Sequence, residues 1–491
     1  MADALAAQGA LTDMCAALQE GRVTSEELVS AALRRIDRHE PQLNAFIEIR
    51  ADAALEAARA SDARRAAGRP LSAIDGAPYA VKDLIDVAGW PTTAGARISP
   101  STDKTKDAGA VARLRAAGAV LLGKTGLHEL AYGVTSENPH FGAVRNPWNV
   151  NWSPGGSSGG SGAAVAAGFA PLALGTDTGC SVRHPAHCCG VVGFKPSHGR
   201  ISAAGVTPLV RQLDHVGCLT RSVADAALAF DVLAGFDPDD PFSDQTPLRA
   251  GKPRAAGGSL RFGRLRGDGF DDGDKETLGL VAAAIEAVAT RLGAEVVDVE
   301  PMGLPQARRA AGALFAGDPS AVHGTALRRT PHLIGEDVRR KLEYGMRLSA
   351  GALAAAQDEA RRFARGMHIL QTARGVDAFL SPTCGAPAPI LRGAAAQSGA
   401  GRAGGALGVL PGEARREHPW ADYATVNCTP FNVSGQPSIS VPCGLTAAGA
   451  PVGLMLTGAR GGDLDLLALA EKAERALAAE GLWARRFPPL D

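Results

Sequence analysis

The stretch from Ser153 to Ala186, SPGGSSGGSGAAVAAGFAPLALGTDTGCSVRHPA, consists largely of glycine, serine and alanine. Runs of glycine and serine are usually flexible linkers. Here apolar runs interrupt the small residues, and the sequence CSVRH at 180–184 closes the stretch. Small side chains let the backbone approach other groups closely, and they leave amides and hydroxyls free to converge on one point. The stretch therefore indicates a tightly packed segment of a folded domain rather than a linker.

Charge and hydropathy restrict the class of protein. The 491 residues carry 51 basic and 51 acidic side chains, so no basic field favours nucleic acid or an anionic membrane. Hydrophobic residues make up 45% and aromatic residues 5% of the chain, which is typical of a globular protein packed around small side chains. We find no apolar run of membrane-spanning length and no secretory signal pattern. The eight cysteines form no C-x-x-C pair, so we expect reduced thiols in a cytoplasmic protein without a metal site.

Alternating helical and strand patterns predict an α/β fold with helices on the faces of a sheet. Thr24 and Glu27 stand in capping-box spacing at the start of one helical pattern. Near the other end of the chain, we expect Asp463 to cap a last helix that Gly481 ends. The expected helices are 23–39, 51–66, 108–118 and the segment after Asp463, and the expected strands are 77–87, 118–125, 437–444 and 450–458.

The chain shows no internal repeat and no clear linker between domains, so we expect a single domain over residues 1–491. Residues 237–275 are rich in Asp, Pro and Gly and predict a surface excursion. Residues 386–416 are rich in Gly and Ala and predict a long loop of the kind that covers a site.

Several chemical interpretations of the opening stretch compete. A phosphate-binding loop is disfavoured because no Gly-Lys-Ser/Thr follows the glycines. The sequence GGSSG at 155–159 satisfies the G-x-S-x-G pattern of a nucleophile elbow, which would require a His and Asp triad. Cys180 and His184 could instead form a thiol–imidazole pair.

A further interpretation uses motifs spread over the whole length. DGAPYAVKDLID, GKTGLHELAYGVTSENPHFGAVRNPWN, GGSSGGSGAAVAAGFAPLALGTDTGCSVRHPA, CGVVGFKPSHGRIS and FNVSGQPSISVPCG follow one another in order. Together they resemble the amidase signature family of serine hydrolases. The resemblance implies one amidase domain whose large mixed β-sheet is covered by helices on both faces. It assigns 1–65 to N-terminal helices, 66–235 and 425–480 to the signature core, and 237–420 to a variable region with surface and lid loops.

The resemblance also implies the roles of individual residues. Ser181 falls on the nucleophile, Lys82 on the base, and Ser157 on the serine that follows a cis peptide bond and relays the proton between them. The remaining assignments are the oxyanion-hole residues Thr178, Gly179 and Cys180, the supporting residues Ser158, Asp177 and Arg183, and the substrate-side residues Ala131, Tyr132, Gly133 and His184.

The chemistry explains the demand for these residue types. A serine hydroxyl is a poor nucleophile until a base takes its proton, and a lysine can act as that base only when neutral. Work near pH 7–8 requires the lysine pKa to fall by roughly 2–3 units from about 10.4. Apolar neighbours in AVKDLI would favour that shift for Lys82. Cys180 and His184 depart from the family, which usually has glycine and an apolar residue there, so substrate preference and efficiency depend on them.

We therefore expect an amidohydrolase that cleaves the C–N bond of a small carboxamide or anilide without a cofactor. The alternatives are a carbamate (urethane) or ester hydrolase with the same triad, an A-type subunit of a glutamyl-tRNA amidotransferase, and an inactive binding protein on the same scaffold. The expected partners are a small-molecule substrate and a second copy in a homodimer, with no nucleic acid and no membrane.

Overall fold

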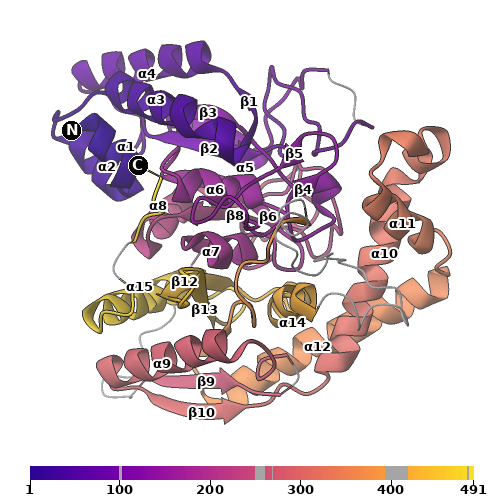
Figure 1. Ribbon diagram of the computed structural model, residues 1–491. Coiled ribbons are helices and arrows are strands. Elements are labelled where there is room, and N and C mark those ends of the chain that lie inside the picture. The colour runs from indigo at the N-terminus through magenta and orange to yellow at the C-terminus, as the bar shows by residue number, and fades with distance from the viewer. Residues whose placement is uncertain (99–101, 249–259, 268, 393–418, 484–485, 491) are drawn as a thin grey trace.

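The computed structural model describes all residues except 99–101, 249–259, 268, 393–418, 484–485 and 491, which are traced in grey in Figure 1. One sheet of eleven strands runs through the molecule from top to bottom in that view. In sheet order the strands are β1 (Phe46–Ile49), β3 (Val120–Thr125), β2 (Pro78–Lys82), β6 (Leu172–Asp177), β8 (His215–Thr220), β7 (Val192–Lys195), β12 (Ser438–Leu445), β13 (Pro451–Thr457), β11 (Ala378–Pro382), β9 (Arg261–Leu265) and β10 (Glu295–Val299).

The sheet is mixed, which confirms the predicted fold class. Strand β2 is parallel to both β3 and β6, whereas β8 is antiparallel to β6 and β7. Strand β12 is antiparallel to β7 and β13, and β11 returns to a parallel pairing with β9. A separate hairpin pairs β4 (Glu137–Asn138) with β5 (Gly142–Ala143).

Helices cover both faces of this sheet. Successive residues of a strand point to opposite faces, and β6 shows this clearly. Leu172 and Leu174 join the core that also contains α8, α9 and α15, whereas Ala173 joins the core beneath α6 and α7. The helices are α1 (Ala2–Gln8), α2 (Leu11–Gln19), α3 (Ser25–Leu43), α4 (Ala51–Ala66), α5 (Gly109–Ala116), α6 (Gly159–Ala166), α7 (Arg183–Cys189), α8 (Val223–Leu233), α9 (Lys275–Leu292), α10 (Leu304–Arg329), α11 (Glu336–Gly345), α12 (Ala350–Arg374), α14 (Pro419–Val433) and α15 (Asp463–Ala479), with short 3₁₀ turns η1 (Glu129–Ala131) and η2 (Pro331–Leu333).

The helix starts predicted near the N-terminus are confirmed. Thr24 Oγ1 accepts a hydrogen bond from Glu27 N, and the Glu27 carboxylate accepts one from Thr24 N, so the capping box opens α3. Helix α4 spans the 51–66 segment predicted from its pattern. At the far end the prediction for Asp463 is wrong: Gly462 is the N-cap of α15, and the Asp463 carboxylate accepts a hydrogen bond from Ser197 N at 2.6 Å.

Two predicted segments have different limits in the structure. The strand expected over 77–87 ends at Lys82, because Leu84 N and Ile85 N both bond to Lys82 O and turn the chain. The surface excursion expected over 237–275 is wrong for Arg261–Leu265, which form β9 inside the sheet. Arginines on this strand pair with acidic residues of β10 and so conceal its apolar side from a sequence pattern. Most of the covering loop expected over 386–416 lies outside the described residues.

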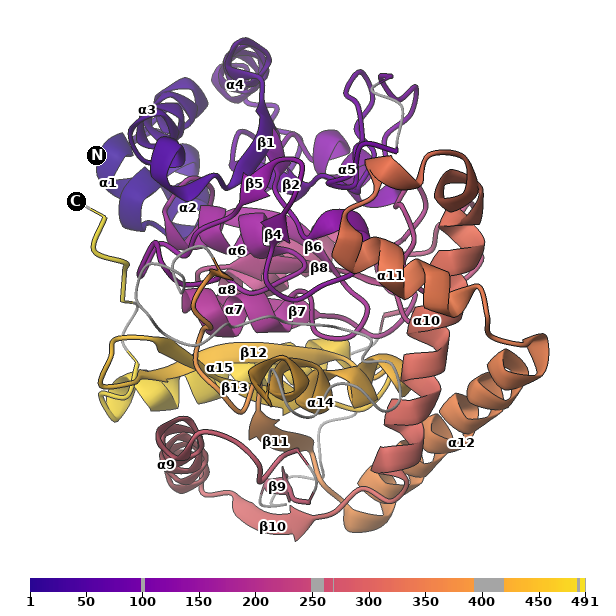
Figure 2. The ribbon, with the colours of Figure 1, turned by 45° about the vertical axis from the view of Figure 1, so that its right-hand side comes forward.

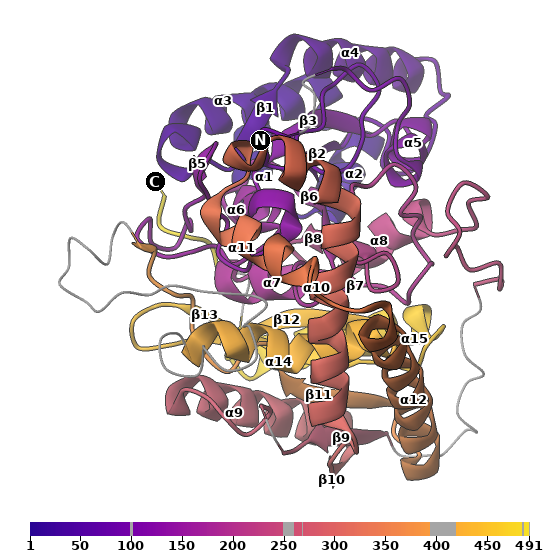
Figure 3. The same ribbon diagram turned by 90° about the vertical axis from the view of Figure 1, so that its right-hand side faces the viewer.

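Helices α10, α11 and α12 form an arm that rises along one side of the molecule. Figures 2 and 3 show the arm leaving the end of the sheet that carries β9 and β10 and bringing α11 over the magenta part of the chain. The arm therefore brings residues 304–374 of the chain next to segments that come much earlier in the sequence. Among the described helices, none combines the length and apolar character that a membrane crossing requires.

Candidate active site

Lys82 lies at the carboxyl end of the parallel strand β2 and is fully buried. Its Nζ donates to Ser157 Oγ at 2.8 Å and to Thr176 Oγ1 at 2.9 Å. Burial lowers the pKa of Lys82 to about 7, and the carboxylates of Asp177 and Asp214 oppose this shift. A substantial fraction of the side chain is therefore neutral near pH 7, as a base must be.

Ser157 stands in the glycine-rich turn before α6, after a cis Gly156–Ser157 peptide bond. Its carbonyl accepts hydrogen bonds from His128 N at 3.1 Å and from Ser136 Oγ at 3.3 Å. A Cβ atom at Gly160 would lie 2.4 Å from Gly126 O, so this turn packs against its neighbours at a distance only glycine permits. The small residues thus hold the Ser157 hydroxyl against the Lys82 amine.

Ser181 lies in the loop that joins β6 to α7 and is 4% exposed. Its carbonyl accepts a hydrogen bond from Ser158 N at 3.2 Å, which ties the two serine-bearing turns together. None of the hydrogen bonds of the described residues joins the Ser157 and Ser181 hydroxyls directly. Catalytic hydrogen bonds are often long in the unliganded state and tighten around a substrate.

The backbone around Ser181 contains amide N–H groups that donate no hydrogen bond to any described residue. The carbonyl of Gly179 is held by Thr429 Oγ1 at 3.3 Å, and the carbonyl of Cys180 accepts from His184 N at 2.7 Å. In the described part of the chain, the amide N–H groups of residues 178–181 have no acceptor. Buried amides without a partner are rare, so this loop presents a group of donors suited to a negatively charged oxygen.

A buried ion pair fixes the shape of the loop. Arg183 donates through Nη2 to Asp177 Oδ1 at 2.8 Å and through Nε to Asp177 Oδ2 at 3.0 Å, so two of the residues expected to support the site bond to each other. Asn432 of α14 donates to both Asp177 O and Asp177 Oδ1, at 2.8 and 2.9 Å. Burial of Asp177 raises its pKa, but the Arg183 charge outweighs this and holds the pKa of Asp177 at about 2, so the pair stays ionised.

Cys180 and His184 do not form the thiol–imidazole pair considered from the sequence. Burial raises the pKa of the Cys180 thiol well above its usual range and lowers the pKa of His184 to about 3. The His184 ring contacts the Cys188 thiol instead, with Nε2 and Sγ 3.3 Å apart. Both residues are buried beside the nucleophile loop, and a neutral thiol is a weak nucleophile.

The three residues expected on the substrate side follow η1. Ala131 adopts a left-handed conformation with φ of 58°, and Tyr132 is 1% exposed. Gly133 carries the ring of His128 against its backbone, where a Cβ atom would lie 2.1 Å from His128 Nε2. His128 N also donates to Ser157 O at 3.1 Å, so this segment lies beside Ser157.

Sequence reasoning missed two side chains that complete the site. Thr176 accepts the second hydrogen bond from Lys82, and the supporting residue Ser158 donates to the Thr176 carbonyl at 3.1 Å. Asp214 accepts a hydrogen bond from Thr178 Oγ1 at 2.6 Å and so anchors the loop of free amides. The signal for Thr176 was its position in GTDTG, two residues before Thr178, but no pattern in the sequence points to Asp214.

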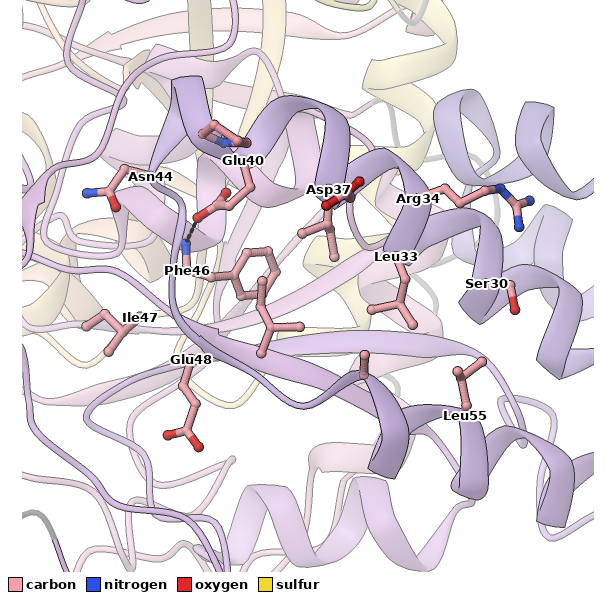
Figure 4. A pocket seen from close by; sticks show the side chains of 14 residues that line it. Ser30, Leu33, Arg34, Asp37, Glu40, Asn44, Phe46, Ile47, Glu48 and Leu55 are labelled. Atoms are coloured by element: carbon pink, nitrogen blue, oxygen red, sulfur yellow. Dashed lines mark hydrogen bonds between the residues drawn. The ribbon is translucent and has the colours of Figure 1, made fainter.

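A hollow lies away from these residues, between α3, β1 and the start of α4. It has a volume of about 830 Å³, and Figure 4 shows Leu33, Phe46 and Leu55 around it. Glu40 Oε1 accepts a hydrogen bond from Phe46 N at 2.7 Å, and burial raises the pKa of Glu40 to about 7. The described side chains contain no group of three or more His, Cys, Asp or Glu residues arranged to hold a metal ion.

Comparison with known proteins identifies the class. The family model described as Amidase matches residues 27–467, a range that includes the middle of the chain. The A-type subunit of glutamyl-tRNA(Gln) amidotransferase from Roseiflexus sp. (strain RS-1) is 37% identical over 98% of both chains. The chain belongs to the amidase signature family.

Solved structures agree with this assignment. One is a chain from a vestigial protein complex described as revealing the origins of an s-triazine catabolic enzyme, with a TM-score of 0.85 and 32% identity over 97% of this chain and 100% of that one. Another is 6-aminohexanoate cyclic dimer hydrolase in complex with its substrate, with a TM-score of 0.81 and 31% identity over 98% of each chain.

Proposed function

We propose that this protein hydrolyses the C–N bond of a small carboxamide or anilide through an acyl-enzyme on Ser181. The observation that carries the proposal is the buried Lys82 amine, which lies 2.8 Å from Ser157 Oγ with its pKa lowered to about 7. A charged lysine in water at the end of a strand could not take a proton at neutral pH, whereas this one can.

The reaction starts with proton removal from Ser181. Neutral Lys82 takes the proton of Ser157, Ser157 takes that of Ser181, and Ser181 Oγ forms a bond to the carbonyl carbon. The carbonyl oxygen becomes negatively charged and accepts hydrogen bonds from the free amides of residues 178–181. When the intermediate collapses, the C–N bond breaks and the proton held by Lys82 returns through Ser157 to the leaving nitrogen.

Deacylation repeats these steps with water. The water loses a proton through Ser157 to Lys82, its oxygen bonds to the acyl carbon, and the bond to Ser181 Oγ breaks as the proton returns from Lys82 through Ser157 to Ser181 Oγ. The released acid and the regenerated serine complete the cycle, and the residues named here supply every proton transfer. The same steps cleave an ester or a carbamate, so the three residues define the reaction class without selecting among these substrates.

A second candidate is an amidotransferase component that releases ammonia from glutamine. The 37% identity to the A-type subunit of glutamyl-tRNA(Gln) amidotransferase over 98% of both chains favours it. The carboxylates beside the Ser181 loop do not separate the two candidates: Asp177 is paired with Arg183, whereas within the described residues Asp214 accepts hydrogen bonds only from the neutral Thr178 hydroxyl and backbone amides. A cytoplasmic homodimer without tRNA belongs to the first candidate, and a complex with further subunits and tRNA to the second.

The test of the triad is labelling with a fluorophosphonate followed by peptide mass mapping. We expect an adduct on Ser181 in the wild-type protein, and at least a roughly 100-fold slower reaction in Lys82→Ala and Ser157→Ala. The matched control is Ser161→Ala, since Ser161 is a buried serine of the same run whose hydroxyl bonds to Leu174 O and Thr125 Oγ1. An adduct on Ser157 that survives the loss of Lys82 would contradict the proposal.

Substrates separate the two candidates. Turnover of 4-nitroacetanilide or a simple carboxamide by the purified chain supports the hydrolase. Glutamine hydrolysis that appears only with added partner subunits supports the amidotransferase. Neither activity, together with no labelling, would favour a binding protein disabled at Cys180.

A further inference from the structure

The segment from His128 to Ser136 has a conformation that needs support from outside. Leu130, Ala131 and Ser136 all have left-handed backbones, with φ of 53°, 58° and 56°. Non-glycine residues adopt this region at a cost and keep it only where surrounding contacts impose it. The segment contains Ala131, Tyr132 and Gly133, which the family resemblance places beside the nucleophile on the substrate side.

The same segment is fastened to the turn of the relay serine near both of its ends. His128 N donates to Ser157 O at 3.1 Å, and Ser136 Oγ donates to Gly155 O at 2.9 Å. A change in the course of residues 128–136 must therefore alter either these bonds or the space beside Ser157.

Helix α11, at the tip of the arm, supplies the support. Lys341 Nζ donates to Tyr132 O at 2.9 Å and to Asp337 Oδ2 at 2.8 Å, and it lies 5.1 Å from the centre of the Tyr132 ring. Asp337 Oδ2 is also 3.4 Å from His128 Nε2. One ion pair on one turn of α11 thus contacts both the start and the middle of the segment.

A second anchor lies immediately before the helix. Gly335 N donates to Glu129 Oε2 at 2.9 Å, and Glu129 Oε1 is 2.9 Å from His140 Nε2. Lys341 is only 5% exposed, and its ammonium group donates to the Asp337 carboxylate and to a carbonyl oxygen. A buried charge held in this way fixes the geometry of what it contacts, because moving it would leave the charge unpaired.

We propose that Lys341 and Asp337 are positioning residues that set the acyl-side wall of the active site through Tyr132 and His128. The wall limits the length of the acyl group that fits beside Ser181, so α11 determines substrate size while the triad performs the chemistry. The link to substrates rests on the proposed function, whereas the support of residues 128–136 by α11 stands without it.

The first test compares two acyl lengths in Lys341→Met, using the 4-nitroanilides of acetic and hexanoic acid. We expect KM for the hexanoyl substrate to change at least about tenfold, with kcat within about threefold and the acetyl substrate little affected. Asp337→Asn should change KM in the same direction, and the double variant should be no worse than the single ones, because the pair acts as a unit. Equal changes in KM for the acetyl and hexanoyl substrates, or a lower kcat with unchanged KM, would overturn the proposal.

The matched control is Arg339→Met, on the same helix, since Arg339 has 39% of its side chain exposed and pairs with Glu343 at 3.7 Å. Lys341→Gln keeps a donor for Tyr132 O without the charge and should restore most of the discrimination. If Lys341→Met proves unstable in thermal unfolding, Asp337→Asn carries the comparison, and Lys341→Gln remains the variant expected to retain the discrimination.

A readout that needs no activity separates this proposal from the proposed function. Hydrogen exchange measured by mass spectrometry should show faster exchange of residues 128–136 in Lys341→Met and unchanged exchange in Arg339→Met. Unchanged exchange in Lys341→Met would overturn the role of α11 even in an active enzyme. Faster exchange in a protein that hydrolyses no amide would sustain the role of α11 and refute the hydrolase.

Discussion

Replacing Lys82 with methionine should make the protein more stable at neutral pH, and the gain should shrink as the pH rises. Burial lowers the pKa of Lys82 from 10.5 to about 7, so the unfolded chain binds a proton that the folded protein releases. At pH 7 this difference costs the folded state about 4 kcal/mol, and at pH 9 about 2 kcal/mol. Because the unfolded state holds more protons over this range, the wild type gains stability as the pH rises, whereas Lys82→Met lacks this contribution.

The assay is urea unfolding of both proteins at pH 7, 8 and 9, followed by tryptophan fluorescence. The difference in unfolding free energy between them should change by about 2 kcal/mol from pH 7 to pH 9 in favour of the wild type, while contributions shared by both proteins cancel. Ser157→Ala is the control, since it removes a hydrogen-bond partner but keeps the lysine and should follow the wild-type slope. A difference that stays constant within about 0.5 kcal/mol would show that Lys82 is charged when folded, and the reasoning for a neutral base would fail.

The remaining predictions concern the pH profile and two buried carboxylates. Because Lys82 must be neutral, kcat/KM should rise about tenfold per pH unit below pH 7 and level off above it, and a flat profile from pH 5 to 8 would exclude Lys82 as the base. Asp177→Asn leaves the Arg183 charge buried without its partner and should cost about 3–5 kcal/mol in urea unfolding. Asp298→Asn, in an exposed pair, should cost less than about 1 kcal/mol, and equal losses would contradict the buried-pair argument. Glu40, whose pKa is raised to about 7, destabilises the folded state as the pH rises from about 4.5 to 7, so Glu40→Gln should gain up to about 3 kcal/mol over the wild type between pH 4.5 and 8, measured by the same unfolding assay.

Patterns in the sequence predicted those secondary-structure elements that interactions between nearby residues determine. The capping box at Thr24 and the alanine-rich pattern of residues 51–66 gave helices that the structure reproduces, because side-chain caps and intrinsic helix propensity act within a few residues. The end of β2 was placed too late in the chain, since apolar residues after Lys82 continue a strand-like pattern through a turn. Because of that turn, Lys82 lies at the carboxyl end of β2.

The site was predictable only in part, for a related reason. The triad lies in motifs whose order along the chain could be read, but its supporting contacts join residues far apart in sequence. Lys341 reaches Tyr132 across 209 positions, and Asn432 reaches Asp177 across 255. Such pairs follow from the way the strands are ordered in the sheet, which hydrophobic periodicity does not specify.

The contact between α14 and the nucleophile loop also fixes when the site can form during synthesis. Arg183 donates to Cys428 O at 3.0 Å and to Asn432 Oδ1 at 2.6 Å, so the loop that carries Ser181 stays incomplete until residues near 430 have left the ribosome. Domains fold as the chain emerges, and late contacts complete early ones. We expect nascent chains stalled before residue 428 to resist fluorophosphonate labelling and chains extended beyond α15 to react. The loop of Ser181 is thus completed by residues of α14 that are synthesised about 250 positions later.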